Sequence, residues 1–200
     1  MILPGGYSDV PAGRIAAVVT HLEMTERPAL RRDPPGTRTL RRVEAPDLDW
    51  YRDLYRRIGE QWLWFSRIRM SDAELAAIVQ SPSVEVYALV LGAREEGLLE
   101  LDFRNPGQCE LALLGLTAQR IGSGAGRWLM NRALERAWSQ TVVRVGVHTC
   151  TFDHPAALAF YQRSGFRPFR RQIEVAADPR LDGTTPRQVA RHVDDPDRPI

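Results

Sequence analysis

A glycine-rich segment at residues 119–127 constrains what this chain can fold into more than any other feature. It reads Gln-Arg-Ile-Gly-Ser-Gly-Ala-Gly-Arg and joins a strand-like run, 109–117, to a helix-like run, 126–138. Glycines at alternate positions let backbone amides approach a ligand without interference from a Cβ atom. The helix that follows adds free amides and the positive end of its dipole. The segment therefore predicts an anion site suited to a pyrophosphate.

Two other nucleotide-binding motifs fit this segment poorly. A Walker loop requires a Gly-Lys-Ser/Thr sequence, which is missing here, and a dinucleotide fingerprint requires G-x-G-x-x-G after the first strand of a βαβ unit. Here the spacing is G-x-G-x-G, and the preceding strand comes late in the chain. From the segment alone, a glycine turn that binds no ligand remains an alternative interpretation.

The hydrophobic periodicity on either side predicts a mixed α+β sheet. Asp47 is a candidate N-cap, and Ser71–Glu74 has the pattern of a capping box. Strands are expected at 15–24, 84–91, 97–103, 109–117, 142–149 and 166–175, with helices at 47–58, 71–80, 126–138 and from His154 onward. The connection 27–46 contains one candidate extended piece, 38–43. Three consecutive strands form a meander, which differs from the βαβαβ repetition of a doubly wound fold.

Length and composition fit one α/β domain. We divide the chain into a lead-in, 1–14, a domain, 15–177, and an extended or partly disordered tail, 178–200. There is no run of 18 apolar residues and no signal-like N-terminus, so we expect neither a membrane span nor secretion. Two cysteines without ligand spacing favour a reducing cytoplasm and predict no metal site. A net charge of +2 gives no argument for a nucleic-acid partner.

A second motif indicates which family this chain is similar to. Residues 154–166, HPAALAFYQRSGF, resemble the signature Asn-x-x-Ala-x-x-x-Tyr-x-x-x-Gly-Phe of the GNAT acetyltransferases. The glycine segment resembles the same family's Arg/Gln-x-x-Gly-x-Gly/Ala loop in two registers, starting at Gln119 or at Ile121. The second register fits the following helix better, although it places isoleucine at the usual arginine or glutamine position. The resemblance implies an α/β/α sandwich whose mainly antiparallel mixed sheet has a splayed central strand pair.

The resemblance also implies where acetyl-CoA, as co-substrate, would bind. The backbone of Leu114, Gly115 and Leu116 would pair with the pantetheine arm, and one of these amides would polarise the thioester carbonyl. The pyrophosphate would lie on the loop formed by Gly122, Ser123, Gly124, Ala125, Gly126 and Arg127. For Arg127, a solvent-facing helix position is the alternative. His154 would contact the pantetheine or the acceptor, or would instead cap the helix that starts at Pro155.

The family's chemistry suggests candidates for proton transfer. Tyr161 stands where many members have the tyrosine that protonates the CoA thiolate, with a core tyrosine as the alternative. Glu110 is the first candidate base, because the resemblance places it where some family members carry a glutamate base. Strand alternation would also place it on one face with Ala112, Leu114 and Leu116; an outward structural glutamate or a water chain is the alternative. His148 is the second candidate base. His21 and Glu100 follow.

The expected activity is transfer of an acetyl group from acetyl-CoA to a primary amine of a small molecule or peptide. A longer acyl donor and a non-catalytic CoA-binding sensor are the alternatives, and a homodimer is compatible with the resemblance. The family's acceptor pocket is implied at the connection 59–70. Its Trp62, Trp64 and Phe65 favour an apolar or aromatic amine or a peptide end, unless they pack beneath the helices.

Overall fold

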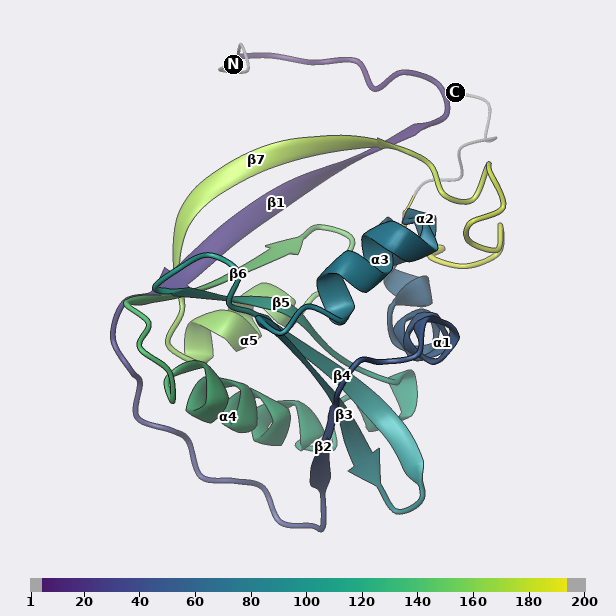
Figure 1. The fold of residues 1–200 in the computed structure, drawn as a ribbon. Coiled ribbons are helices and arrows are strands. Elements are labelled where there is room, and N and C mark those ends of the chain that lie inside the picture. Colours follow the sequence, from purple (N-terminus) through teal and green to yellow (C-terminus); the bar gives the residue numbers. More distant parts are fainter. Residues whose placement is uncertain (1–4, 194–200) are drawn as a thin grey trace.

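The computed structural model describes residues 5–193 and contains a sheet of seven strands. Their order across the sheet is β2-β3-β4-β5-β6-β1-β7 (Figure 1). The strands are β1 (Arg14–Met24), β2 (Thr39–Val43), β3 (Val84–Leu91), β4 (Arg94–Asp102), β5 (Gln108–Leu116), β6 (Arg144–Cys150) and β7 (Arg167–Ala177). The expected meander is present, since β3, β4 and β5 pair antiparallel in sequence order.

Helices cover both faces of this sheet (Figure 1). They are α1 (Leu48–Gly59), α2 (Ser66–Arg69), α3 (Asp72–Val79), α4 (Ala125–Ala137) and α5 (Ala157–Arg163), with single 3-10 turns at Glu60–Trp62 and Ala118–Arg120. Asp47 caps α1 and the capping box at Ser71 opens α3, as predicted. One core lies between the sheet and α1 with α3, and a larger one lies between the sheet and α4 with α5. We call these two sides the α1 face and the α4 face.

The N-terminal strand lies near the far edge of the sheet from β2. β1 pairs antiparallel with β6 on one side and with β7 on the other, so the first strand in sequence lies between the last two. Its alternation places Ile15, Val19 and His21 on the α1 face, while Leu22 and Met24 pack into the core on the α4 face.

The central strand pair is splayed, as the fold prediction requires. β5 and β6 run parallel but pair at only three positions, from Gln108–Arg144 to Glu110–Gly146. Beyond them, the edge of β5 that faces β6 has no strand partner among residues 5–193. A register shift opposite Glu100 and Leu101 inserts Ala112 as an extra residue in β5. Such a bulge changes which face the following side chains point to.

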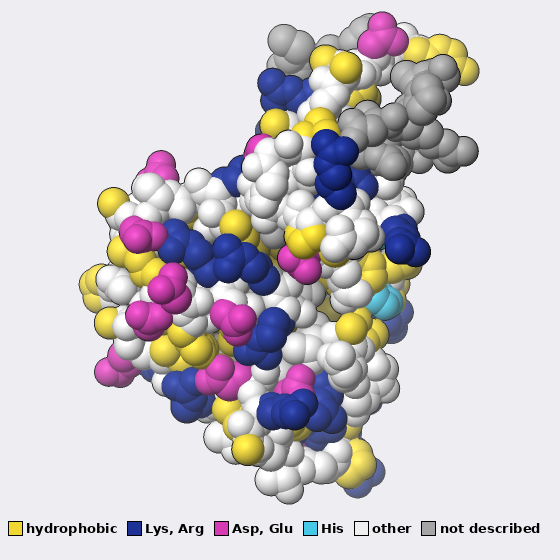
Figure 2. Space-filling view, turned by 90° about the vertical axis from the view of Figure 1, so that its right-hand side faces the viewer, with side chains coloured by type: hydrophobic (Ala, Val, Ile, Leu, Met, Phe, Trp, Pro, Cys, Tyr) yellow, Lys and Arg dark blue, Asp and Glu magenta, His cyan; other side chains and the backbone are white. Residues whose placement is uncertain are grey.

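The segment after β7 has no helix or strand in residues 178–193, but it packs on the domain. Ala190 joins a hydrophobic cluster with Ile15 and Leu63, and the Asp178–Arg180 ion pair is buried. None of the described helices is long and apolar enough to cross a membrane. On the face shown in Figure 2, arginines and carboxylates are interspersed and form no single basic patch.

Candidate active site

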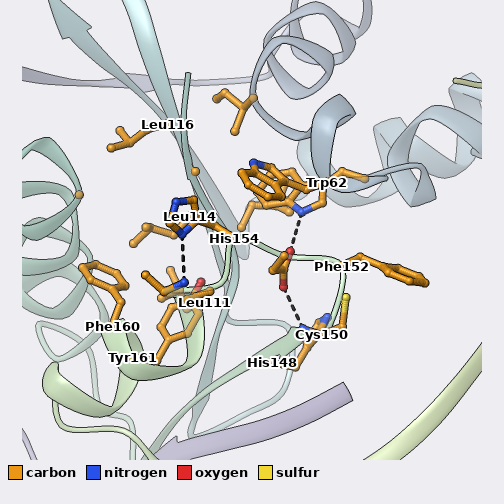
Figure 3. A pocket seen from close by; sticks show the side chains of 18 of the residues that line it. Trp62, Leu111, Leu114, Leu116, His148, Cys150, Phe152, His154, Phe160 and Tyr161 are labelled. Carbon is orange, nitrogen blue, oxygen red and sulfur yellow. Dashed lines mark hydrogen bonds between the residues drawn. The ribbon is translucent and has the colours of Figure 1, made fainter. Parts of the chain in front are cut away.

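A cavity of about 640 Å³ runs through the splay between β5 and β6. Its α4 half is lined by the glycine loop, by Leu114 and Leu116, and by α5. Its α1 half is lined by the connection between α1 and α2 and by residues of β1, β6 and β7. Figure 3 shows side chains of the connection, β5, β6 and α5 around one space, among them Trp62, Leu114, His148 and Tyr161. The cavity therefore joins the two faces of the sheet.

The glycine loop has the geometry of an anion site. Gly122 and Gly124 have φ values of +80° and +83°, a region that disfavours residues with a Cβ, and Gly124 is the N-cap of α4. Among the described residues, no acceptor bonds the amides of Gly122, Gly124, Gly126 and Arg127. Ser123 supports the loop from within, because its hydroxyl donates to Arg120 O at 2.7 Å. The free amides converge at a helix N-terminus, where a phosphate is stabilised.

The register that begins at Ile121 fits the cavity. Ile121, Gly122, Gly124 and Gly126 line it together with Arg127, whereas Gln119 does not. Ser123 and Ala125, also expected at the cofactor, do not line it, and Ala125 is fully buried in the core. Two further arginines, Arg31 and Arg163, lie at the same half of the cavity. The α4 half thus combines backbone amides with guanidinium groups, which suits a polyphosphate ligand.

Tyr161 lies on α5 between the core and the cavity. Its ring packs edge-on against Phe160 and Phe166, and the residue is 8% exposed. Its hydroxyl has no hydrogen-bond partner among the described residues, and burial raises its pKa above the ordinary value of a tyrosine. Tyr161 therefore stays protonated at neutral pH and has a proton that it can donate into the cavity. Tyr161 is therefore part of the hydrophobic core and also part of the cavity lining.

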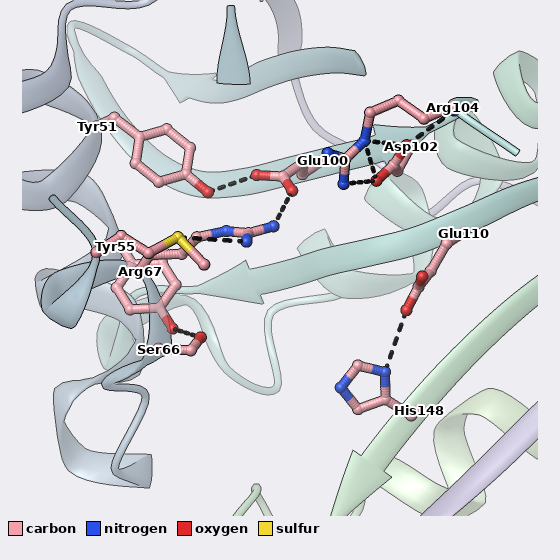
Figure 4. Close-up of polar contacts among 10 residues, drawn as sticks. Tyr51, Tyr55, Ser66, Arg67, Glu100, Asp102, Arg104, Glu110 and His148 are labelled. Carbon is pink, nitrogen blue, oxygen red and sulfur yellow. Dashed lines mark hydrogen bonds and ion pairs between the residues drawn. The ribbon is translucent and has the colours of Figure 1, made fainter. Parts of the chain in front are cut away.

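Glu110 and His148, the two leading base candidates, contact each other. His148 Nδ1 lies 3.3 Å from Glu110 Oε1 where the splay begins (Figure 4), and both side chains are about half exposed. The hydrogen bond raises the pKa of His148 and lowers that of Glu110. Only His148 of the two lines the cavity. The pair therefore presents the imidazole to the cavity and keeps the carboxylate behind it.

The expectation that Glu110 shares a face with Leu114 and Leu116 is wrong. Leu114 and Leu116 pack on the α4 face, whereas Glu110 pairs with Asp102, two residues from Glu100, which bonds Tyr51 of α1. The bulge at Ala112 reverses the alternation between Glu110 and Leu114. Glu110 consequently faces α1, on the same side as His148.

Trp64 links the two sides of the splay on the α1 face. Its Nε1 donates to Asp153 Oδ1 at 2.9 Å, and Asp153 in turn accepts from Thr149 Oγ1 and from Cys150 N. A Cβ at Gly115 would collide with Ile58 and would lie 2.9 Å from the Trp64 ring, so only glycine permits the close approach of both side chains. Trp62 and Trp64 line the cavity and do not simply fill the core beneath the helices.

His154 has the capping role expected of it, and its contact with a ligand stays a prediction. Its Nδ1 accepts from Ala156 N at 3.0 Å, which caps the turn before α5. Its ring also lines the cavity and packs edge-on against Trp62, with 5.2 Å between ring centroids. The second neighbour of Trp62 is His192, whose Nε2 lies 3.0 Å from Phe152 O. Through His192, the C-terminal segment thus contacts Trp62 and Phe152, two aromatic residues of the cavity lining.

The two weaker base candidates have other positions. Glu100 is fully buried and bonds both Tyr51 Oη and Arg67 Nη2 at 2.5 Å, so it anchors α2 to the sheet (Figure 4). His21 faces His148 across β1 and β6, with 5.7 Å between ring centroids, but it does not line the cavity. Neither is placed to accept a proton from a ligand.

Sequence reasoning missed two acidic residues of the site. Asp153 holds Trp64, and Glu174 of β7 lines the cavity beside Ala176. The carboxylate of Glu174 has no hydrogen-bond or ion-pair partner among residues 5–193. No local signal could have found Glu174, because it reaches the cavity only through the pairing of β7 with β1.

Comparisons with solved structures show the same fold at low sequence identity. A functionally unknown conserved protein from Staphylococcus epidermidis is 12% identical, with a TM-score of 0.55 over 83% of this chain and 63% of that one. A GCN5-related N-acetyltransferase from Sphaerobacter thermophilus is 15% identical, with a TM-score of 0.57 over 84% and 52%. An aminoglycoside acetyltransferase from an uncultured soil sample is 18% identical, with a TM-score of 0.52 over 64% and 87%. The chain therefore spans less than two thirds of the first two of these structures.

The remaining comparisons concern sequence. No curated protein matches this chain. Residues 48–166 match the model of the acetyltransferase (GNAT) family, and this range contains the glycine loop, the splayed strands and the 154–166 motif. The chain belongs to the GNAT family of acetyltransferases.

Proposed function

We propose that this protein transfers an acetyl group from acetyl-CoA to a primary amine by direct attack within a ternary complex. One observation carries the proposal: the cavity passes through the sheet at the splay, with an anion-binding loop at one end and a histidine–carboxylate pair at the other. Such a passage lets a thioester and an amine meet from opposite faces.

The α4 half fits the CoA portion of the donor. The free amides of the glycine loop would hold the pyrophosphate, with Arg127 and the neighbouring Arg31 and Arg163 available to phosphate oxygens. The unpaired edge of β5 at Leu114–Leu116 offers backbone groups to the amides of the pantetheine arm, which would extend the sheet as an added strand. An amide on this edge would stabilise negative charge that develops on the carbonyl oxygen.

Two side chains are proposed to move protons. His148 accepts the proton that the attacking amine loses, and Glu110 orients the imidazole and stabilises the charge that forms. Tyr161, on the other face, donates its proton to the sulfur as the carbon–sulfur bond breaks. The carbon–nitrogen bond forms between these groups, so the acid and the base act from opposite sides of the sheet.

Calorimetry with acetyl-CoA, followed by thiol release over a panel of amines, tests the proposal. Tyr161→Phe should leave the dissociation constant of acetyl-CoA nearly unchanged and lower kcat by about 100-fold, because the proton donor is removed. Tyr87→Phe is the matched control, since that hydroxyl bonds Glu85 outside the cavity and its loss should leave kcat close to that of the parent.

Each result has a distinct meaning. Acetyl-CoA binding with no turnover on any amine would contradict the enzyme and favour a CoA-binding module. Faster transfer from butyryl-CoA than from acetyl-CoA would overturn the choice of donor. Equal kcat values for the parent and Tyr161→Phe would reject the role of Tyr161.

A further inference from the structure

The α1 half of the cavity has a distinctive chemistry. Its walls are apolar and largely aromatic, formed by Ile15 and Val19 of β1, Trp62, Leu63 and Phe65 of the connection, and Phe152 after β6. Leu63 and Ile15 continue into the hydrophobic cluster that the C-terminal segment closes with Ala190. A ligand in this half therefore meets a mainly apolar wall, together with polar side chains at Ser66, His148, Asp153, His154 and Glu174.

Two carboxylates line this half, which also contains His148, an imidazole that carries a positive charge when protonated. Glu174 lines it, Asp153 lines it while bonded to Trp64, and Glu110 stands behind His148. The three arginines among the described lining residues, Arg31, Arg127 and Arg163, all lie at the α4 half. A carboxylate in the α1 half would consequently face acidic groups, and the guanidinium of Arg69, which lies over the Phe65 ring, is already paired with Asp182. An ammonium group would be attracted.

Glu174 is the carboxylate that remains available to a ligand. Asp153 already accepts from Trp64, Thr149 and Cys150, and Glu110 contacts His148. Glu174 has no such partner among residues 5–193 and lies on β7, next to the apolar wall formed by β1. An ammonium group attracted by Glu174 would lie in the same half of the cavity as His148.

From this combination we infer that the acceptor is a hydrophobic primary amine without a carboxylate, an arylalkyl- or alkylamine, whose apolar body lies between Trp62 and Phe152 and whose ammonium group is recognised by Glu174. The inference rests on the proposed function for its reaction and on the α1 half for its selectivity. It separates this site from one built for amino acids, which would need a cation for the carboxylate. It also separates it from one built for polyhydroxylated amines, whose hydroxyl groups the apolar walls of this half could not bond.

Matched pairs of amines test the inference. 2-Phenylethylamine and L-phenylalanine differ only by a carboxylate, as do tryptamine and L-tryptophan, and kanamycin supplies a polar polycation. We expect kcat/KM to favour the amine of each pair by at least about tenfold, because a carboxylate in the α1 half would meet like charge. Calorimetric binding of 2-phenylethylamine and of L-phenylalanine to the protein, with and without CoA, gives the same comparison independently of turnover.

Glu174→Gln isolates the recognition of the ammonium group. It should lower kcat/KM for 2-phenylethylamine by about three- to tenfold. It should also reduce the ratio of kcat/KM for 2-phenylethylamine to kcat/KM for L-phenylalanine. Glu26→Gln, an exposed residue outside the cavity with the same change in charge, should leave that preference as it is. Trp62→Ala should raise KM for both aromatic amines while the dissociation constant of acetyl-CoA stays nearly unchanged.

The outcomes that overturn the inference differ from those that overturn the proposed function. Preference for L-phenylalanine or kanamycin, in turnover or in binding, would reject the substrate class while leaving acetyl transfer intact. An unchanged preference in Glu174→Gln would reject the role of that carboxylate. Failure to bind acetyl-CoA would contradict the proposed function alone, because the binding comparison between 2-phenylethylamine and L-phenylalanine still decides the chemistry of the α1 half.

Discussion

Gly122 and Gly124 adopt the same backbone conformation for different structural reasons. Both have positive φ, so any other residue would be strained there. A Cβ at Gly122 would meet no atom within 4 Å, whereas at Gly124 it would lie 2.8 Å from Pro34 Cβ. The first position borders open space at the cavity, and the second lets the connection between β1 and β2 pass close to the loop.

Alanine substitutions should separate these two constraints. Gly122→Ala should cost about 1–2 kcal/mol of unfolding free energy through backbone strain and should weaken acetyl-CoA binding, because its methyl group enters the space next to the free amides. Gly124→Ala should cost more, since the collision with Pro34 adds to the strain. Chemical denaturation and calorimetry measure the two quantities.

Gly92→Ala is the control for strain alone. Gly92 has a φ of +63° in the turn between β3 and β4, with open space around it and no contact with the cavity. It should lose similar stability with no change in acetyl-CoA affinity. An equal loss of affinity in Gly92→Ala and Gly122→Ala would contradict the assignment of the loop.

The Glu110–His148 pair predicts a pH dependence. His148 must be neutral to accept a proton, and its raised pKa means that kcat/KM falls as the pH drops through a value above the ordinary 6.5. Glu110→Gln removes the main cause of that shift, so the acidic limb of the profile should move to lower pH. Asp153, Glu174 and His21 also face His148, and all three remain in this variant.

Rate profiles of the parent and Glu110→Gln with one amine measure this shift. The amine's own ionisation contributes equally to both profiles and cancels in the comparison. Glu44→Gln, an exposed carboxylate away from the cavity, should leave the acidic limb in place. An acidic limb that stays fixed in Glu110→Gln would show that His148 is not the group that titrates.

At the scale of elements, the aromatic connection between α1 and α3 is held in place from three directions. Arg67 of α2 bonds the buried Glu100 of β4, Trp64 bonds Asp153 after β6, and the C-terminal segment packs Ala190 against Leu63. Each contact joins segments far apart in sequence. The connection can therefore present its aromatic side chains to the cavity although it contains only short helical turns of its own.

Loosening the C-terminal segment should lower the stability of the fold and weaken binding of the acceptor amine. Ala190→Glu introduces a charge at a residue that is 5% exposed and lies among apolar side chains, and burying it is unfavourable. We expect a Tm at least about 3 °C lower and a higher KM for the amine, with acetyl-CoA affinity nearly unchanged. Thermal denaturation and steady-state kinetics measure these effects.

Gln188→Glu adds the same charge at an exposed position of the same segment and is the matched control. It should leave Tm and KM close to the parent values. If Ala190→Glu and Gln188→Glu show the same Tm and the same KM for the amine, the C-terminal segment does not support the α1 half of the cavity.

At the scale of the whole molecule, the α4 half and the α1 half of one cavity are lined from opposite faces of the sheet. Under the proposed function, the acyl donor and the amine would bind at the same time, one in each half, and no covalent carrier would be needed. The thiols are also poorly suited to carry an acyl group, because burial raises the pKa of Cys109 to about 12 and that of Cys150 to about 11. Neither is appreciably ionised at neutral pH.

The kinetic mechanism should accordingly be sequential. Initial rates measured over both substrates should give intersecting lines in double-reciprocal plots, and mass spectrometry should find no acetylated enzyme after incubation with acetyl-CoA alone. Cys150→Ala should retain most of the activity. Parallel lines, or an acetyl group on Cys150, would contradict direct transfer.

The sequence alone determined the features that depend on short stretches of chain. The caps at Asp47 and Ser71, the strand β3 at 84–91 and the glycine loop before α4 all follow from local periodicity, turn chemistry and backbone freedom. The pairing of that loop with the 154–166 motif also indicated the family, because each motif is a contiguous run of residues.

Only the tertiary structure decided which residues share the site. The position of β1 between β6 and β7 brings Glu174 to the cavity, and a one-residue bulge at Ala112 turns Glu110 toward His148. Trp64 and Asp153 meet although they are 89 residues apart. Strand order, bulges and such long-range contacts are set by packing of the whole chain, and no short window of sequence encodes them.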